Sequence, residues 1–240
     1  FNQSSSDADG DYVVNNFAYY KNGVLKSTRI IDDDSLVLWI PMDENRSNTV
    51  LDYSGNGLNG TIVGANFTNN ERLGGGYEFS QVISEGDYIS VPLVNTGGNL
   101  TVMVLVNVTQ PGLTNEEIIF QGPCDLVTGL CSYFISFESL TQRFIFNIRN
   151  TTDSSIDPNR LNASAGPYHN RTTFLAMTYN SSVMNVYVDG VLRMNSSNFT
   201  GPIISGNGNI SLGAFSGGFR DINAYSFLNG TIDEAAVWRR

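Results

Sequence analysis

The chain of 240 residues offers few side chains for catalysis. His169 is its one histidine, so a Ser-His-Asp or Cys-His group would have to use it, and a metal site of several histidines is impossible. Glycosidases need two carboxylates at matched positions, as in a Glu-x-Asp-x-x-Glu strand, and that pattern does not occur. Glu116 and Glu117 are adjacent, so on a strand they would point to opposite faces. We therefore expect a protein that is not an enzyme.

Asparagines in the acceptor pattern for N-glycosylation are far more abundant. The 28 Asn and 41 Ser and Thr residues would give roughly five Asn-x-Ser/Thr sequons by chance placement. Fourteen occur, and none has Pro in the middle. An Asn-rich β protein produces some sequons by composition alone, but this excess indicates a glycan coat and hence a secreted, extracellular or cell-surface protein. The acceptor residues are Asn2, Asn45, Asn59, Asn66, Asn99, Asn107, Asn150, Asn162, Asn170, Asn180, Asn195, Asn198, Asn209 and Asn229.

The two cysteines, Cys124 and Cys131, enclose a six-residue spacer that contains Gly129. In an oxidising compartment they could close one loop through a disulfide, and otherwise they would be two unpaired thiols. A metal-binding pair would need a shorter spacing and a second pair of ligands, which the chain lacks. Neither alternative implies catalysis.

The net charge narrows the choice of partners. Thirteen Lys and Arg residues against 23 Asp and Glu residues give a formal charge of −10. Nucleic acids and anionic membranes are bound by basic surfaces, so we expect neither as a partner. No apolar run approaches the roughly 18 residues that cross a bilayer, so we expect no membrane insertion.

These side chains must be positioned by β-strands. Short alternating segments bounded by Gly, Asn, Asp and Ser recur along the chain, and helical periodicity is nearly absent. In 100–108 one face is apolar, while the other, with Met103 and Leu105, is only partly wet. About a dozen such strands favour an all-β sandwich of two antiparallel sheets, of the jelly-roll type. The clearest strands are Leu36–Ile40, Tyr88–Val91, Leu100–Val108, Tyr133–Phe137, Arg143–Arg149, Thr173–Tyr179, Met184–Val188, Ile210–Gly213 and Thr231–Trp238.

Two dipeptides predict tight hairpins, and one of them defines a separate unit. Asn22-Gly23 suits a type I′ turn because both of its residues tolerate positive φ, and Asp189-Gly190 between NVYV and VLRM is typical of a tight hairpin. The first lies in residues 1–34, which begin with a polar, low-complexity stretch and which we interpret as an N-terminal arm or hairpin. This arm packs on its own domain, residues 35–240, or adds strands to a neighbouring subunit.

Several motifs together resemble one family. They are LVLWIPMDE, DYSGNGLNGTIVGANF, GGGYEFS, VYVDGVL and GTIDEAAVW, in that order along about residues 36–240, and VYVDGVL lies in a segment that looks like the family's paired central strands. Together they resemble the laminin G-like group of concanavalin A-like lectin/glucanase domains. The resemblance implies a jelly roll, and Leu105 stands where members usually carry Trp.

The resemblance also implies a calcium ion, since many members hold one near these loops through carboxylates and backbone carbonyls. Asp52 and Asp233 are the best candidates for its ligands, and Asp43 is the next candidate. The alternative is that these side chains accept hydrogen bonds and cap loops.

Two functions stay open. The preferred interpretation is a structural or adhesive surface protein, a subunit that self-associates into a filament or layer through its N-terminal arm. The alternative is a calcium-dependent, carbohydrate-binding module of a larger cell-surface protein. Its sugar platform would need aromatic side chains, but most of the available ones fit better in the core: Tyr133, Phe134, Phe137, Phe144 and Phe146.

Overall fold

The structure is a computed structural model of the chain. It describes residues 15–21, 24–31, 35–71, 73–80, 86–92, 98–109, 116–125, 130–150, 160–163, 168, 170–204, 206–215 and 227–239. Asn2 and His169 lie outside these residues. In the part of the chain that is described, no helix is long and apolar enough to span a membrane.

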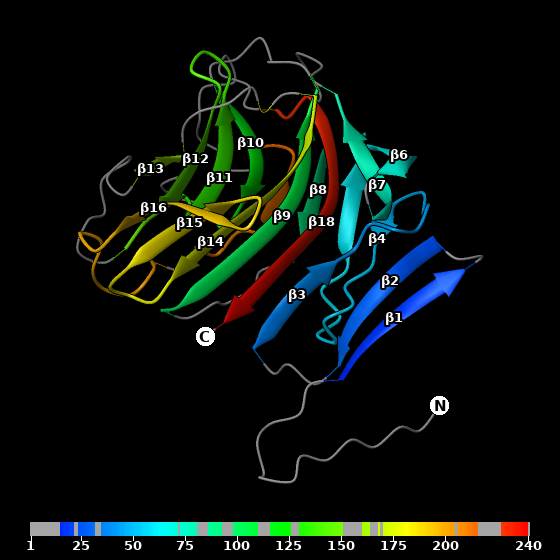
Figure 1. The fold of residues 1–240 in the computed structure, drawn as a ribbon, viewed down its shortest axis with the longest axis horizontal. Helices are drawn as coiled ribbons and strands as arrows, with labels where there is room; N and C mark the ends of the chain where they lie inside the picture. Colours follow the sequence, from blue (N-terminus) through cyan, green and yellow to red (C-terminus); the bar gives the residue numbers. More distant parts are fainter. Residues whose placement is uncertain are drawn as a thin grey trace, which may run out of the picture.

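Two antiparallel sheets face each other (Figure 1). The first, here called the groove sheet, has the order β16 (Val191–Ser196), β15 (Met184–Val188), β14 (Thr172–Tyr179), β9 (Leu100–Val108), β18 (Gly230–Arg239), β7 (Gly74–Phe79) and β6 (Asn66–Glu71), and β3 (Leu36–Ile40) also pairs with β18. The second, the opposite sheet, has the order β13 (Arg160–Ala163), β12 (Arg143–Ile148), β11 (Tyr133–Glu138), β10 (Glu116–Gln121), β17 (Ile210–Leu212), β8 (Tyr88–Val91), β5 (Gly60–Val63) and β4 (Thr49–Val50).

The core fills the space between the sheets. In strand β14 every second side chain points into this space, because successive residues of a strand face opposite sides. The inward residues are Thr173, Leu175, Met177 and Tyr179, and the residues between them are less buried. On the opposite sheet, Tyr133 and phenylalanines such as Phe120 are among the largest fully buried side chains. The predicted all-β jelly roll is confirmed, and each predicted strand is present with ends that differ by no more than one residue.

Both predicted hairpins have their paired strands, and the turn residues Asn22 and Gly23 of the first lie outside the described residues. Asp189 and Gly190 have φ values of 53° and 75°, as a type I′ turn between β15 and β16 requires. Near the N-terminus, β1 (Asn15–Lys21) pairs with β2 (Val24–Ile31) and, among the described strands, with nothing else. Whether this hairpin joins a neighbouring subunit stays a prediction.

Candidate functional site

A groove of about 650 Å³ lies on the outer face of the groove sheet. Its floor comes from the three central strands β14, β9 and β18, and one rim comes from the β15–β16 hairpin. This volume is in the range of small-molecule sites. The lining residues are Leu73, Met103, Leu105, Arg171, Thr172, Phe174, Asp189, Gly190 and Glu234.

Strand register sets the shape of the floor. Phe174, Leu105 and Glu234 are direct neighbours across the three strands. In an adjacent row, Met103 lies between two alanines, Ala176 and Ala236. Small side chains beside a long one leave a hollow on the sheet surface, so the phenyl ring and the thioether line an apolar floor.

An ion pair forms the rim. The Arg171 guanidinium pairs with the Asp189 carboxylate and also lies over the Tyr168 ring, 5.6 Å from its centroid. Asp189 Oδ1 accepts the Phe174 N–H at 3.1 Å, and the Asp189 N–H donates to the Phe174 carbonyl at 2.8 Å. The hairpin therefore fixes the rim to the floor.

Glu234 is the titratable group of the floor. Burial raises the pKa of its carboxyl to about 7, and the nearby Asp233 and Asp43 carboxylates raise it further, while a hydrogen bond from Trp39 opposes them. Near neutral pH, Glu234 is thus partly protonated and can both donate and accept hydrogen bonds. The groove contains no uncompensated cation among its lining residues, because Asp189 pairs with Arg171.

Aromatic side chains extend this surface beyond the groove. Both tryptophans, Trp39 and Trp238, pack with Tyr53 and Met103 in a small apolar cluster on the outer face. Trp39 and Tyr53 meet edge to face with their centroids 6.1 Å apart. Since Met103 belongs to both, the groove and the aromatic cluster are continuous.

Asp52, the first predicted calcium ligand, caps a loop. Its Oδ1 accepts the N–H groups of Trp39 and Ser54 at 3.0 and 2.9 Å. Its Oδ2 accepts the Leu58 N–H at 2.9 Å and the Ser54 hydroxyl at 2.8 Å. The carboxylate thus holds the loop 52–58 along the outer edge of β3, where the Asn56 amide also donates to the carbonyls of Leu36 and Val37.

Asp233 and Asp43 lie elsewhere, Asp233 in β18 and Asp43 shortly after the end of β3. Asp233 is 1% exposed and accepts the Leu73 N–H at 2.9 Å, whereas Asp43 accepts the Gly75 N–H at 3.1 Å. Strand β3 therefore separates Asp52 from Asp233, and the structure brings Asp43 and Asp233 together with Glu234 instead. Within the described ranges, no group of three or more His, Cys, Asp or Glu side chains is arranged to hold a metal ion.

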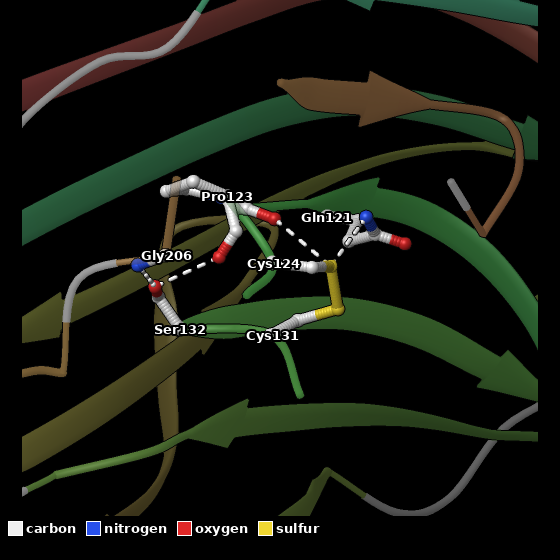
Figure 2. Close-up of a disulfide and its surroundings, with 7 residues drawn as sticks. Gln121, Pro123, Cys124, Cys131, Ser132 and Gly206 are labelled. Atoms are coloured by element: carbon white, nitrogen blue, oxygen red, sulfur yellow. Dashed lines mark hydrogen bonds between the residues drawn. A yellow bond between two sulfur atoms is a disulfide. The ribbon is translucent and has the colours of Figure 1, made fainter. Parts of the chain in front are cut away.

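The two cysteines form a disulfide at the end of the β10–β11 hairpin (Figure 2). Gln121 donates to Cys124 Sγ, and the Ser132 hydroxyl bridges the Pro123 carbonyl and the Gly206 N–H. These hydrogen bonds connect the disulfide loop to the neighbouring segments at Gln121 and Gly206. Disulfides of this kind are typical of extracellular proteins.

Thirteen of the fourteen sequon asparagines lie in the described part of the chain. Four are half-buried, namely Asn99, Asn107, Asn162 and Asn229. Asn150 is 0% exposed and its amide donates to the Tyr179 hydroxyl at 3.5 Å, so the folded chain has no room for a glycan there. Eight are exposed, namely Asn45, Asn59, Asn66, Asn170, Asn180, Asn195, Asn198 and Asn209.

The acidic residues considered for catalysis have structural partners. Glu117 is fully buried and accepts the Ser139 hydroxyl and the Asn229 N–H. Glu116 accepts the Ser136 hydroxyl and pairs with Arg160. These carboxylates support the strand β10 and its neighbours.

The aromatic residues considered for a sugar platform are mostly core, as expected, since Tyr133, Phe137, Phe144 and Phe146 are fully buried. Phe174 was missed as a surface residue. Its signal was present in TTFLAMTY, where it is the one large apolar side chain among Thr172, Ala176 and Thr178 on the outward face.

Comparison with known proteins assigns the chain to a family. The family model Laminin_G_3, described as the concanavalin A-like lectin/glucanases superfamily, matches residues 83–240. No curated protein matches the chain.

Solved structures of similar fold include the binding domain of Paraclostridial Mosquitocidal Protein 1, with a TM-score of 0.63 and 16% identity over 86% of this chain and 49% of that one. Domain 4 of AbnA, an extracellular arabinanase from Geobacillus stearothermophilus in complex with arabinotriose, has a TM-score of 0.59 and 18% identity over 85% and 92%. The Trypanosoma rangeli sialidase has a TM-score of 0.61 and 12% identity over 88% and 32%. The chain spans about half the length of the toxin binding domain, and at these identities the likeness is one of fold.

Proposed function

The chain belongs to the concanavalin A-like lectin/glucanase superfamily, and from this premise we propose that it is a lectin-like domain of an extracellular glycoprotein, without catalytic activity, that binds a saccharide in its groove. The observation that carries the proposal is the groove itself, with an apolar floor at Phe174 and Met103 and hydrogen-bonding groups at its edge. A sugar ring has the same division into apolar C–H faces and hydroxyl groups. Aromatic surfaces take the former, and side chains such as those of Arg171 and Asp189 take the latter.

The charges of the groove favour a neutral saccharide. Arg171 is neutralised by Asp189, while Glu234 has two further carboxylates near it. An anionic sugar would meet these carboxylates in a chain with a net charge of −10. Like charges brought together without compensation weaken binding, so sialylated or uronic-acid ligands are disfavoured.

A titration of neutral oligosaccharides tests the proposal, with arabinotriose as the first probe because the arabinanase domain is in complex with it. Phe174→Ala removes the aromatic ring of the floor and should weaken binding by about tenfold, because an aromatic contact contributes about 0.5–1.5 kcal/mol in addition to the apolar area that it buries. Phe134→Ala is the matched control, since Phe134 is a half-buried phenylalanine on the opposite sheet.

Isothermal titration calorimetry gives the affinities of both variants. Equal loss in both variants, or no binding of any neutral saccharide by the parent protein, refutes the proposed site. Lactose and sialyllactose serve as a pair that differs by one charged residue, and tighter binding of sialyllactose contradicts the preference for neutral ligands.

Calcium stays a prediction. Carboxylates such as those of Asp43 and Asp233 are the ligands that a hard cation takes, but among the described residues they belong to no group of three or more arranged to hold a metal ion. Asp52 does not fit, because its oxygens already accept four hydrogen bonds. A melting temperature that rises with calcium and falls with EDTA would support a structural ion, and one unchanged by either would dismiss it.

Assembly into a filament through the N-terminal arm also stays a prediction. The observation in its favour is that β1 and β2 pair with each other and, within the described strands, with neither large sheet. Light scattering of the chain with and without residues 1–34 tests it.

A further inference from the structure

The sheets of the sandwich end in strands with an open side. The groove sheet ends at β16 and β6, and the opposite sheet ends at β13 and β4. An open side presents unpaired N–H and C=O groups, which can pair with another chain. Strand β4 has two residues and offers little to pair with, and the outer side of β3 is already bonded by the loop 52–58. The edges that matter are therefore β6, β13 and β16.

Strand β16 carries a second hazard. Val191, Leu192 and Met194 are 52%, 46% and 38% exposed. They are three of the five large hydrophobic side chains that are exposed in the described part of the chain. An exposed, apolar strand with an open side is a predicted site of aggregation.

Each of these three edge strands contains a sequon asparagine: Asn66 in β6, Asn162 in β13 and Asn195 in β16. Asn66 and Asn195 are exposed, and Asn162 is half-buried. Among the inner strands of both sheets, Asn107 in β9 is the one other sequon asparagine within the bounds of a described strand. Acceptor residues inside strands therefore concentrate at the edges.

We propose that N-glycans on Asn66, Asn162 and Asn195 protect the three edge strands from pairing with other chains. A glycan is bulky and strongly hydrated, so at these positions it obstructs the approach of a second strand. On β16, Asn195 and Leu192 lie opposite Asn185 and Tyr187, the less buried residues of β15, so a glycan on Asn195 also screens the exposed Leu192. The proposal rests on glycosylation of the chain and is independent of saccharide binding in the groove.

The test compares two variants that each lose three sequons. The edge variant Thr68→Ala/Ser164→Ala/Ser197→Ala removes the acceptor patterns of Asn66, Asn162 and Asn195 and keeps the asparagines. The control variant Ser47→Ala/Thr61→Ala/Ser182→Ala removes those of Asn45, Asn59 and Asn180, which lie outside strands, by changing three exposed side chains. Both are produced with the parent protein in a eukaryotic secretory host.

Glycopeptide mass spectrometry establishes occupancy, and light scattering over rising protein concentration measures mass. We expect the parent and the control variant to stay at the mass of one chain and the edge variant to form dimers and larger species. Empty sites at Asn66, Asn162 and Asn195 in the parent overturn the proposal, as does equal mass for both variants.

A second measurement avoids misfolding of a variant. The folded parent protein is treated with an endoglycosidase, and its circular dichroism is recorded before and after. Self-association of a protein whose spectrum is unchanged supports the proposal, whereas a trimmed protein that keeps the mass of one chain at all concentrations overturns it.

Discussion

Strands β3 and β16 are both outer strands of the groove sheet, but the outer side of β3 is covered by a loop and that of β16 is exposed. All five residues of β3 are buried, and side chains of the loop 52–58 bond to its backbone. In β16 five of six residues are exposed, and no described strand pairs with its outer side. The first edge is closed by the chain's own hydrogen bonds, and the second must be protected by something bulkier, which we infer to be carbohydrate.

Removing the Asp52 carboxylate, which holds the loop 52–58 against β3, should have the largest effect on stability. Asp52→Ala deletes four hydrogen bonds and leaves the Trp39 and Leu58 N–H groups without an acceptor, so we expect a loss of about 3 kcal/mol in the free energy of unfolding. Urea denaturation measures it. A loss below about 1 kcal/mol would mean that water replaces the carboxylate and that the edge of β3 is not closed by this side chain.

Glu234, a residue of β18, makes the free energy of unfolding depend on pH. Its pKa is about 7 in the folded chain against an ordinary 4.5. Between these two pH values the folded state binds more protons than the unfolded state. The stabilisation that protonated Glu234 contributes is therefore fully present below about pH 4.5 and is lost as the pH rises through about 7. Glu234→Gln should add on the order of 2 kcal/mol at pH 8 and little at pH 4.5, since each pKa unit corresponds to about 1.4 kcal/mol and partial exposure reduces the effect.

Thermal unfolding in EDTA at the two pH values checks this prediction. If the variant gains as much at pH 4.5 as at pH 8, the gain has another origin than the charge of Glu234.

Asn56→Ala tests the contribution of the Asn56 side chain to closing the outer side of β3. It removes the donors to the Leu36 and Val37 carbonyls, each bond being 3.1 Å long, and we expect a loss of about 1 kcal/mol because these groups are partly solvated. Urea denaturation beside Asp52→Ala gives the ranking. A larger loss than that of Asp52→Ala would reverse the assignment of roles in the loop.

Replacing the exposed apolar side chains of β16 should hardly affect the free energy of unfolding. Val191→Thr/Leu192→Thr/Met194→Thr replaces exposed side chains, so we expect a change within about 0.5 kcal/mol. The same variant, once deglycosylated, should associate less than the deglycosylated parent protein in light scattering. Undiminished association would locate the contact on another edge.

Much of the fold could be predicted because strand periodicity and turn chemistry are local. Asp189-Gly190 fixes its turn through the φ values that these two residues tolerate, and the alternation of TTFLAMTY fixes which side chains enter the core. The partly wet outer face of β9 was also predictable, since Met103 and Leu105 interrupt what would otherwise be polar positions.

The site could not be predicted to the same extent, because its parts come from strands far apart in the sequence. Register alone places Phe174 and Glu234 on either side of Leu105. Asp52 shows a second limit. Its place in DYSGNG is compatible with capping and with metal binding alike, and only the positions of the surrounding N–H groups distinguish the two.

The position of β18 has a consequence for how the chain is made. Residues 230–239 form its central strand, between β9 on one side and β7 and β3 on the other, and β3 pairs with no other described strand. A chain emerging from the ribosome therefore cannot complete this sheet until residues more than 190 positions after β3 have appeared. Throughout that interval, acceptor asparagines remain accessible to enzymes that act on unfolded chains, and Asn150 is accessible only then.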